Sequence, residues 1–179
     1  MDQTLEDAIR ELLDRQEITD VIHRGARATD RGDQELLRSI YHPDAEDFHG
    51  IYNGSVREMF EGSDEMRSPY IVLSHVVSNI QIELAGDRAH VETYLSAVHR
   101  AQTPEGLRDD FLRCRYIDGF ERRGGEWRIA RRVVVYDWGE SRPAGEVAWW
   151  DVAPGDYVFG SQSPDDRVFI DRAHNLRGV

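Results

Sequence analysis

Four β-rich runs follow one another closely after Pro69, and they restrict the possible folds more than any other feature of the sequence. The runs cover residues 74–84, 88–101, 107–122 and 126–137. The turns between them, such as residues 85–87 and 124–125, are short and carry glycine. Val, Ile, Tyr, Phe and Thr favour strands, and short turns join antiparallel neighbours. The runs therefore predict a four-stranded antiparallel meander.

The chain before the meander has a helical pattern. Apolar side chains recur at helical spacing from Leu5 to about Thr29, which predicts one long amphipathic helix or two helices joined near residues 15–17. Gly32 is a residue type that ends helices, and a short helix is expected over residues 34–41. Asp30 is therefore expected at the end of the first long helix.

The segment between the helices and the meander alternates turns with short elements. Residues 42–44 predict a turn, residues 46–52 a strand, and Asn53-Gly54 a second turn before a helix over residues 55–67. Helices followed by a curved antiparallel sheet are typical of an α+β domain in which the helices close one face of the sheet. The space between the two layers is the natural place for a pocket.

Residues 1–142 are expected to form this domain, and residues 143–179 an ordered arm of the same domain. The arm is rich in aromatic and turn residues but has no clear periodicity. It could cover the pocket or pack on a neighbouring subunit.

Charge and cysteine content restrict the partners and the compartment. The formal charge is −12, the isoelectric point is about 5.0, and no Lys/Arg-rich run is present. A phosphate backbone or an anionic membrane surface would repel such a chain, so neither nucleic acid nor membrane is expected as a partner. The lone Cys114 suits a reducing compartment and is expected to be a small core residue. With no apolar run near the ~20 residues of a membrane span, we expect a cytoplasmic protein.

The stretch HPDAEDFHG raises the question of a metal site. It places His42, Asp44, Asp47 and His49 within eight residues, all of them metal-ligating types. Their spacing fits a turn and a strand better than a metal site, and nucleotide-binding and zinc motifs are absent from the sequence. We expect neither a metal nor a cofactor. Asp47 and His49 share a strand face and could line a pocket.

Residue position alone is a weak guide to catalysis. His75 opens the first meander strand, with Asn79 expected on the same face, and a single histidine in an apolar strand is more often structural than catalytic. Asp30 could simply cap a helix end. Arg132 has Arg131 beside it, so it could be one of two arginines that decorate a strand.

A family resemblance covers the chain up to about Asp137. The sequence resembles the SnoaL-like branch of the nuclear transport factor 2-like superfamily in the stretches ATDRGD, SIYHPDAEDFHG, SHVVSNIQIEL, AHVETYLSAVHR and RYIDGFERRGGEWRIARRVVVYDW. This resemblance implies a cone-shaped, curved antiparallel sheet closed by the N-terminal helices, also known as the cystatin-like roll. It further implies a homodimer or homotrimer.

The resemblance also implies roles for particular residues. Scytalone dehydratase, bile acid 7α-dehydratase and hexachlorocyclohexane dehydrochlorinase share an Asp–His dyad in a conical pocket, which Asp30 and His75 match. Arg132 matches the pocket arginine of the dehydrochlorinase. Gly25 is a departure, because relatives carry a polar Lys, Gln or Tyr there. The family register implies that the pocket is lined, together with Asp47 and His49, by Tyr70, Leu73, Leu95, Ala97, His99, Leu112, Tyr116, Tyr136 and Trp138.

The function that these residues imply is that of a cofactor-independent lyase. His75 would remove a proton while the Asp30 carboxylate fixes its tautomer, and Arg132 would stabilise developing negative charge. The leading reaction is elimination of water or another leaving group from an aromatic, polyketide-like or steroid-like compound. Retro-aldol cleavage would use the same base. Isomerisation or aldol cyclisation, a non-catalytic binding or assembly module, and a metal-dependent enzyme remain alternatives.

Overall fold

The computed structural model describes residues 4–62, 70–145, 148–153 and 155–177. The N-terminal half of the chain contributes α1 (Leu5–Arg31), α2 (Gln34–Ser39), β1 (Tyr41–Phe48), β2 (Asn53–Ser55) and α3 (Val56–Glu61). The long strands follow as β3 (Tyr70–Ala85), β4 (Arg88–Thr103), β5 (Gly106–Arg123) and β6 (Glu126–Pro143). Three short helices end the chain, namely α5 (Trp149–Val152), α6 (Arg167–Ile170) and α7 (Arg172–Arg177).

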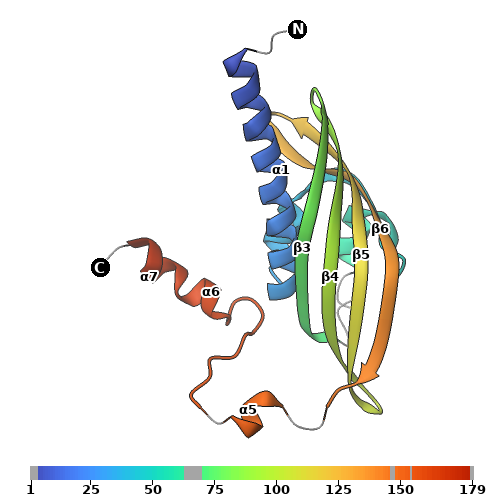
Figure 1. The fold of residues 1–179 in the computed structure, drawn as a ribbon, viewed down its shortest axis with the longest axis vertical. Helices are drawn as coiled ribbons and strands as arrows, with labels where there is room; N and C mark the ends of the chain where they lie inside the picture. The colour runs from blue at the N-terminus through green and yellow to red at the C-terminus, as the bar shows by residue number, and fades with distance from the viewer. Residues whose placement is uncertain (1–3, 63–69, 146–147, 154, 178–179) are drawn as a thin grey trace.

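The strands form one curved, unclosed six-stranded sheet in the order β2-β1-β6-β5-β4-β3. Neighbours pair antiparallel except β1 and β6, which are parallel. Helix α1 runs alongside the long strands and packs against β3 and β6 (Figure 1). The α+β class and the predicted antiparallel meander are thus confirmed.

Helix α1 is a single helix, and its ends explain its length. The Thr4 side chain accepts a hydrogen bond from the Asp7 backbone N–H, which satisfies one of the free donors of the first turn. Gly32 ends the helix with a φ of 64°, a left-handed conformation that glycine adopts without steric cost. Asp30 therefore lies in the last turn of α1, as the sequence predicts.

The core lies between the buried face of α1 and the inner face of the sheet. Ile18, Val21 and Ile22 are buried there against the ends of the strands next to the β3–β4 and β5–β6 turns. Cys114 is buried in a second cluster further along the sheet, in agreement with its predicted core role. Apolar side chains complete the first cluster, among them Val91, Phe120, Trp127 and Ile129.

Local predictions around β1 and β2 were wrong. Asn53-Gly54 was expected to form a turn but belongs to β2. Residues 42–44 were expected to form a turn but belong to β1, whose register with β6 shifts between Tyr41 and Glu46. Proline has no N–H to donate, so Pro43 is tolerated where the ladder is interrupted. The predicted helix over residues 55–67 ends at Glu61 in α3, and its continuation beyond Gly62 lies outside the described residues.

Asn79 does not share the face of His75, contrary to expectation. It has a φ of 47° at an irregularity in the pairing of β3 with β4, between Ser78 and Gln81, and is exposed. Asparagine adopts this left-handed conformation more readily than most residues. The irregularity works as a β-bulge. After it, the apolar side chains of Ile80, Ile82 and Leu84 face the core.

The C-terminal arm leaves the end of β6 and returns to the last turn of α1 (Figure 1). Arg31 forms an ion pair with Asp166 at 3.2 Å, and the Ser163 N–H donates to the Arg31 carbonyl at 2.6 Å. The Arg27 guanidinium lies over the Phe169 ring. Within the described residues, no helix has both the length and the apolar character to span a membrane.

Candidate active site

A cavity of about 200 Å³ lies between the helices and the inner face of the sheet, beyond the α1 core. Every element from α1 to β6 except β2 contributes to it. Its described lining consists of Thr29, Gln34, Leu37, Tyr41, Asp47, His49, Ile51, Tyr52, Met59, Phe60, Tyr70, Leu73, His75, His99, Tyr116 and Arg132.

Asp30 and His75 are joined by two hydrogen bonds at this cavity. The His75 Nδ1 lies 2.6 Å from the Asp30 Oδ1, and the His75 backbone N–H donates to the Oδ2 at 3.0 Å. Only 7% of the His75 side chain and 14% of the Asp30 side chain are exposed. The carboxylate fixes both the position of β3 relative to α1 and the tautomer of His75, because the Nδ1 must carry the proton.

His99 caps the other nitrogen of His75. The two Nε2 atoms lie 3.1 Å apart. With the proton of His75 on Nδ1, its Nε2 is an acceptor, so the His99 Nε2 must be the donor. Burial, with a further contribution from the neighbouring His75, lowers the pKa of His99 to about 4. His99 is therefore a neutral hydrogen-bond donor at neutral pH.

A row of charges crosses the cavity floor on three adjacent strands. The register places Asp47 of β1 beside Arg132 of β6, and Arg132 beside Asp118 of β5. The Arg132 Nε and Nη2 both donate to the Asp118 carboxylate, at 2.8 and 2.7 Å. Burial disfavours the charged guanidinium, but the charge of Asp118 outweighs it and raises the pKa of Arg132. The guanidinium also lies 3.9 Å from the Tyr116 ring centroid.

Asp47 and His49 form a second carboxylate–imidazole pair at the cavity. The His49 Nδ1 lies 3.2 Å from the Asp47 Oδ1, and the Tyr41 hydroxyl donates to the Oδ2 at 2.8 Å. Burial works to raise the pKa of Asp47, but the hydrogen bond from His49 and the charge of Arg132 outweigh it and lower that pKa. Asp47 is therefore ionised although only 1% of its side chain is exposed.

The remaining residues expected in the pocket lie elsewhere on the sheet. Leu95, Ala97 and Leu112 belong to the second apolar cluster, with Cys114, and none is part of the described lining. Tyr136 and Trp138 are about half exposed on β6, outside that lining as well. Their role in substrate binding stays a prediction. The structure does bring together Tyr70, Leu73, His99 and Tyr116, as well as Asp47 and His49, around His75 and Arg132.

Gly25 is buried where α1 meets the residue after α2. A Cβ at this position would lie 2.7 Å from the Ile40 Cδ1, closer than van der Waals contact allows. The close approach of Ile40 therefore takes the space that a longer side chain would need. Gly25 adds no polar group to the described cavity lining.

Sequence reasoning missed several residues of this site. Tyr41, Tyr52 and Phe60 line the cavity because β1 pairs with a strand far along the chain, which periodicity does not reveal. Asp118 was not among the residues expected at the pocket, although its carboxylate binds Arg132. A buried arginine needs an acidic partner, so the expected burial of Arg132 could have indicated a carboxylate on a neighbouring strand.

The residues of the HPDAEDFHG stretch separate in space. The His42 ring lies against the Glu121 carbonyl, Asp44 pairs with Arg123 on the surface, and only Asp47 and His49 reach the cavity. Among the described residues, no group of three or more His, Cys, Asp or Glu side chains could hold a metal ion.

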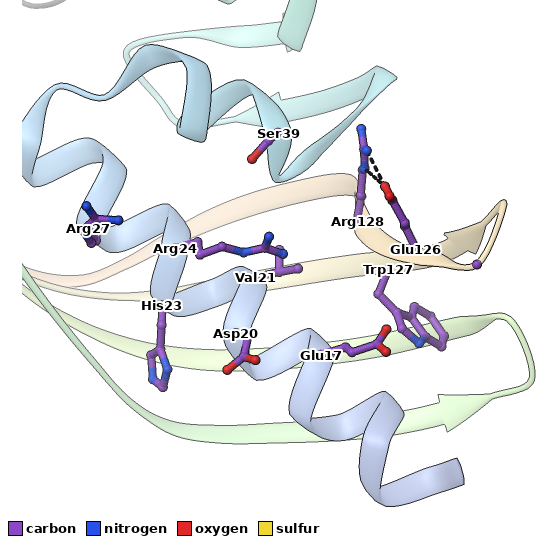
Figure 2. A pocket seen from close by; sticks show the side chains of 11 residues that line it. Glu17, Asp20, Val21, His23, Arg24, Arg27, Ser39, Glu126, Trp127 and Arg128 are labelled. Atoms are coloured by element: carbon purple, nitrogen blue, oxygen red, sulfur yellow. Dashed lines mark hydrogen bonds and ion pairs between the residues drawn. The ribbon is translucent and has the colours of Figure 1, made fainter. Parts of the chain in front are cut away.

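A second hollow of about 780 Å³ lies on the outside of α1, and its chemistry is different. Figure 2 shows Glu17 and Arg24 of α1 extending toward the β5–β6 turn, where Arg128 is bound to Glu126. Its lining combines carboxylates and guanidinium groups, among them Glu17, Asp20, Arg24 and Arg27. Such a lining is typical of a solvated surface rather than of a pocket for an apolar molecule.

Solved structures share this fold at low sequence identity. A protein from Novosphingobium aromaticivorans provisionally assigned as a scytalone dehydratase is 20% identical, with a TM-score of 0.65 over 77% of this chain and 97% of its own. A type 3 hexachlorocyclohexane dehydrochlorinase from Novosphingobium barchaimii is 19% identical, with a TM-score of 0.66 over 79% and 98% of the two chains. A protein with a cystatin-like fold from Nostoc punctiforme is 21% identical, with a TM-score of 0.58 over 76% of this chain and 96% of its own.

A search of curated protein sequences finds no match. The family model for the SnoaL-like domain matches residues 10–133, which include most of the long helix, the long strands up to Val133 and both members of the Asp30–His75 pair. This match covers well over half of the sequence. The chain therefore belongs to the SnoaL-like family.

Proposed function

We propose that this protein is a lyase that needs no cofactor and eliminates a small group from a largely apolar molecule. The observation that carries the proposal is the Asp30 carboxylate, which holds both the ring and the backbone of His75 at the wall of a cavity. A carboxylate in this position orients an imidazole as a general base and stabilises the imidazolium that forms. Dehydratases and dehydrochlorinases among the similar folds support this reaction class.

In this proposal, substrate takes the place of His99 at the His75 Nε2. His75 then removes a proton from carbon, and the displaced His99 turns its N–H toward the carbonyl oxygen on which charge develops. A neutral imidazole suits this role, because it can donate a hydrogen bond to the developing enolate oxygen without giving up its proton. The pKa of His99, lowered to about 4 mainly by burial, keeps it neutral.

The cavity limits the size of the substrate. At about 200 Å³ it is smaller than the roughly 300–1,000 Å³ of pockets for drug-sized ligands. The lining combines aromatic rings such as Tyr70 and Phe60 with a few polar groups. We therefore propose a substrate of one or two rings with a carbonyl group next to the acidic C–H bond.

The test is turnover of a β-hydroxy ketone with one aromatic ring, followed by the appearance of the conjugated enone. His75→Ala and Asp30→Asn are expected to lower kcat/KM by roughly 10²–10⁴-fold, the usual contribution of a general base. His90→Gln is the matched control, because His90 is exposed on β4 outside the cavity lining. Retro-aldol cleavage would instead release an aldehyde, and unchanged turnover in both variants would refute the base assignment.

A further inference from the structure

Elimination of a poor leaving group needs an acid as well as a base, and the cavity holds a second imidazole that the base does not use. His49 lies at the end of β1, where the Tyr136 hydroxyl donates to its backbone carbonyl at 2.9 Å. Its side chain is about one-third exposed and lines the cavity. The titratable or charged groups around it are Asp47 and Tyr41 on β1, Tyr116 on β5, Arg132 and Tyr136 on β6, and His99 on β4.

His49 and His99 lie in opposite electrostatic surroundings. The Asp47 carboxylate lies on the Nδ1 of His49, while the Tyr41 hydroxyl donates to the same carboxylate and Arg132 lies beside it on β6. An ionised partner stabilises the protonated imidazole. His99, in contrast, is neutral and already donates its proton to His75. Of the two, only His49 has a carboxylate as its hydrogen-bond partner.

The other groups around His49 are poor proton donors at neutral pH. Burial raises the pKa of Tyr41 and Tyr116, and Tyr41 already donates its proton to Asp47. Burial also raises the pKa of Tyr136 to about 12. Arg132 has two nitrogens bound to Asp118 and keeps its proton. With these groups excluded, the His49–Asp47 pair remains as the candidate proton donor.

We propose that His49, held by Asp47, gives a proton to the departing group, and that this group is a hydroxyl that leaves as water rather than a halide. This inference rests on the proposed function of His75. The His75 Nε2 takes the proton from carbon, and the C–H electron pair becomes the new C=C bond. The C–O bond breaks toward oxygen, which takes the Nε2 proton of His49. The proton gained by His75 returns to His49 through solvent.

A halide leaves as a stable anion and gains little from an acid, whereas hydroxide is a poor leaving group. The experiment therefore compares a β-hydroxy ketone with the matching β-chloro ketone, which differ only in the leaving group. His49→Gln is expected to lower kcat for the hydroxy ketone by about 10²-fold or more, and for the chloro ketone by less than about threefold. His90→Gln, the same change at an exposed histidine, is expected to leave both rates unchanged.

The outcomes separate the two proposals. If His49→Gln lowers both rates equally, or lowers neither, the acid role is overturned. If His75→Ala lowers neither rate, the proposed base fails instead. A readout without turnover covers the case in which neither probe reacts. In ¹⁵N NMR of the histidine rings, Asp47→Asn should move the Nδ1 resonance of His49, because its hydrogen-bond partner changes, and leave that of His75 in place. An unmoved His49 resonance overturns the inference.

Discussion

The inner face of the sheet has two ends that differ in chemistry although the same four strands run through both. Next to the β3–β4 and β5–β6 turns, the strands face α1 and bury apolar side chains such as Val91, Phe120 and Ile129. Further along, the same strands carry His75, His99 and other titratable groups around the cavity. The apolar end can stabilise the strands while the polar end carries groups that cost free energy to bury.

The strongest test of this difference between the two ends is a substitution in the buried Arg132–Asp118 ion pair. Arg132→Met should lower the free energy of unfolding by roughly 3–5 kcal/mol, because it leaves the Asp118 carboxylate buried without a partner. Urea denaturation measures this loss. The double variant Asp118→Leu/Arg132→Met should lose less, since an apolar pair leaves no unpaired charge. Equal losses in the single and double variants would show that the carboxylate finds another partner.

A substitution at the apolar end should affect stability without affecting chemistry. Ile18→Ala removes a fully buried side chain of α1 and should lower the free energy of unfolding by about 2–5 kcal/mol. Leu12→Ala is the control on the same helix, because Leu12 is 67% exposed and should change stability by less than about 0.5 kcal/mol. Well below the melting temperature, the elimination rate of Ile18→Ala should match that of the wild type. A large loss of rate would show that the two ends are coupled.

The polar end should make stability depend on pH. The unfolded His99 takes up a proton near pH 6.5, whereas the folded one does so only at about 4, mainly because of burial that lowers its pKa. The unfolded state therefore binds more protons between these values, and stability falls as the pH is lowered through this window. In His99→Gln, melting temperatures between pH 7 and 4 should fall less steeply than in the wild type. Parallel curves would contradict the depressed pKa.

The smallest effect is expected at Gly25 of α1. Gly25→Ala gains about 1 kcal/mol of helix propensity but brings a Cβ to 2.7 Å from the Ile40 Cδ1. These effects oppose each other, so the free energy of unfolding should change by less than about 1 kcal/mol. Thermal melting measures the net effect of helix propensity and steric contact on stability. A loss above about 2 kcal/mol would mean that Ile40 has no room to move.

Local patterns were enough to predict the elements that make the larger part of the fold. The helical spacing from Leu5 onward and the glycine turns of the meander predicted α1 and the four long strands within a few residues, apart from an early end to β6. Strand β1 was misjudged because its partner, β6, follows some eighty residues later, and Pro43 looked like a turn. Periodicity reports which face a residue takes, but not which distant strand lies beside it.

The site was less predictable for a related reason. Asp30, His75 and Arg132 were singled out by family resemblance, since each has an ordinary structural role when taken alone. Counting back from the Gly124–Gly125 turn would place Asp118 opposite Arg131. A register shift between Gly119 and Phe120 instead places it opposite Arg132. A one-residue bulge of this kind has no clear sign in a single sequence.

That bulge and the neighbouring arginines together affect how the chain folds. If β5 and β6 first pair without the bulge, Asp118 meets Arg131, so the wrong register also gives the buried carboxylate a cationic partner. In the native structure Arg131 instead lies over the Phe48 ring on the other face. Because Asp118 could pair with either arginine, we expect this alignment to compete with the native one during folding, a form of frustration. Removing the charge of Arg131 would leave one favourable register and should simplify refolding.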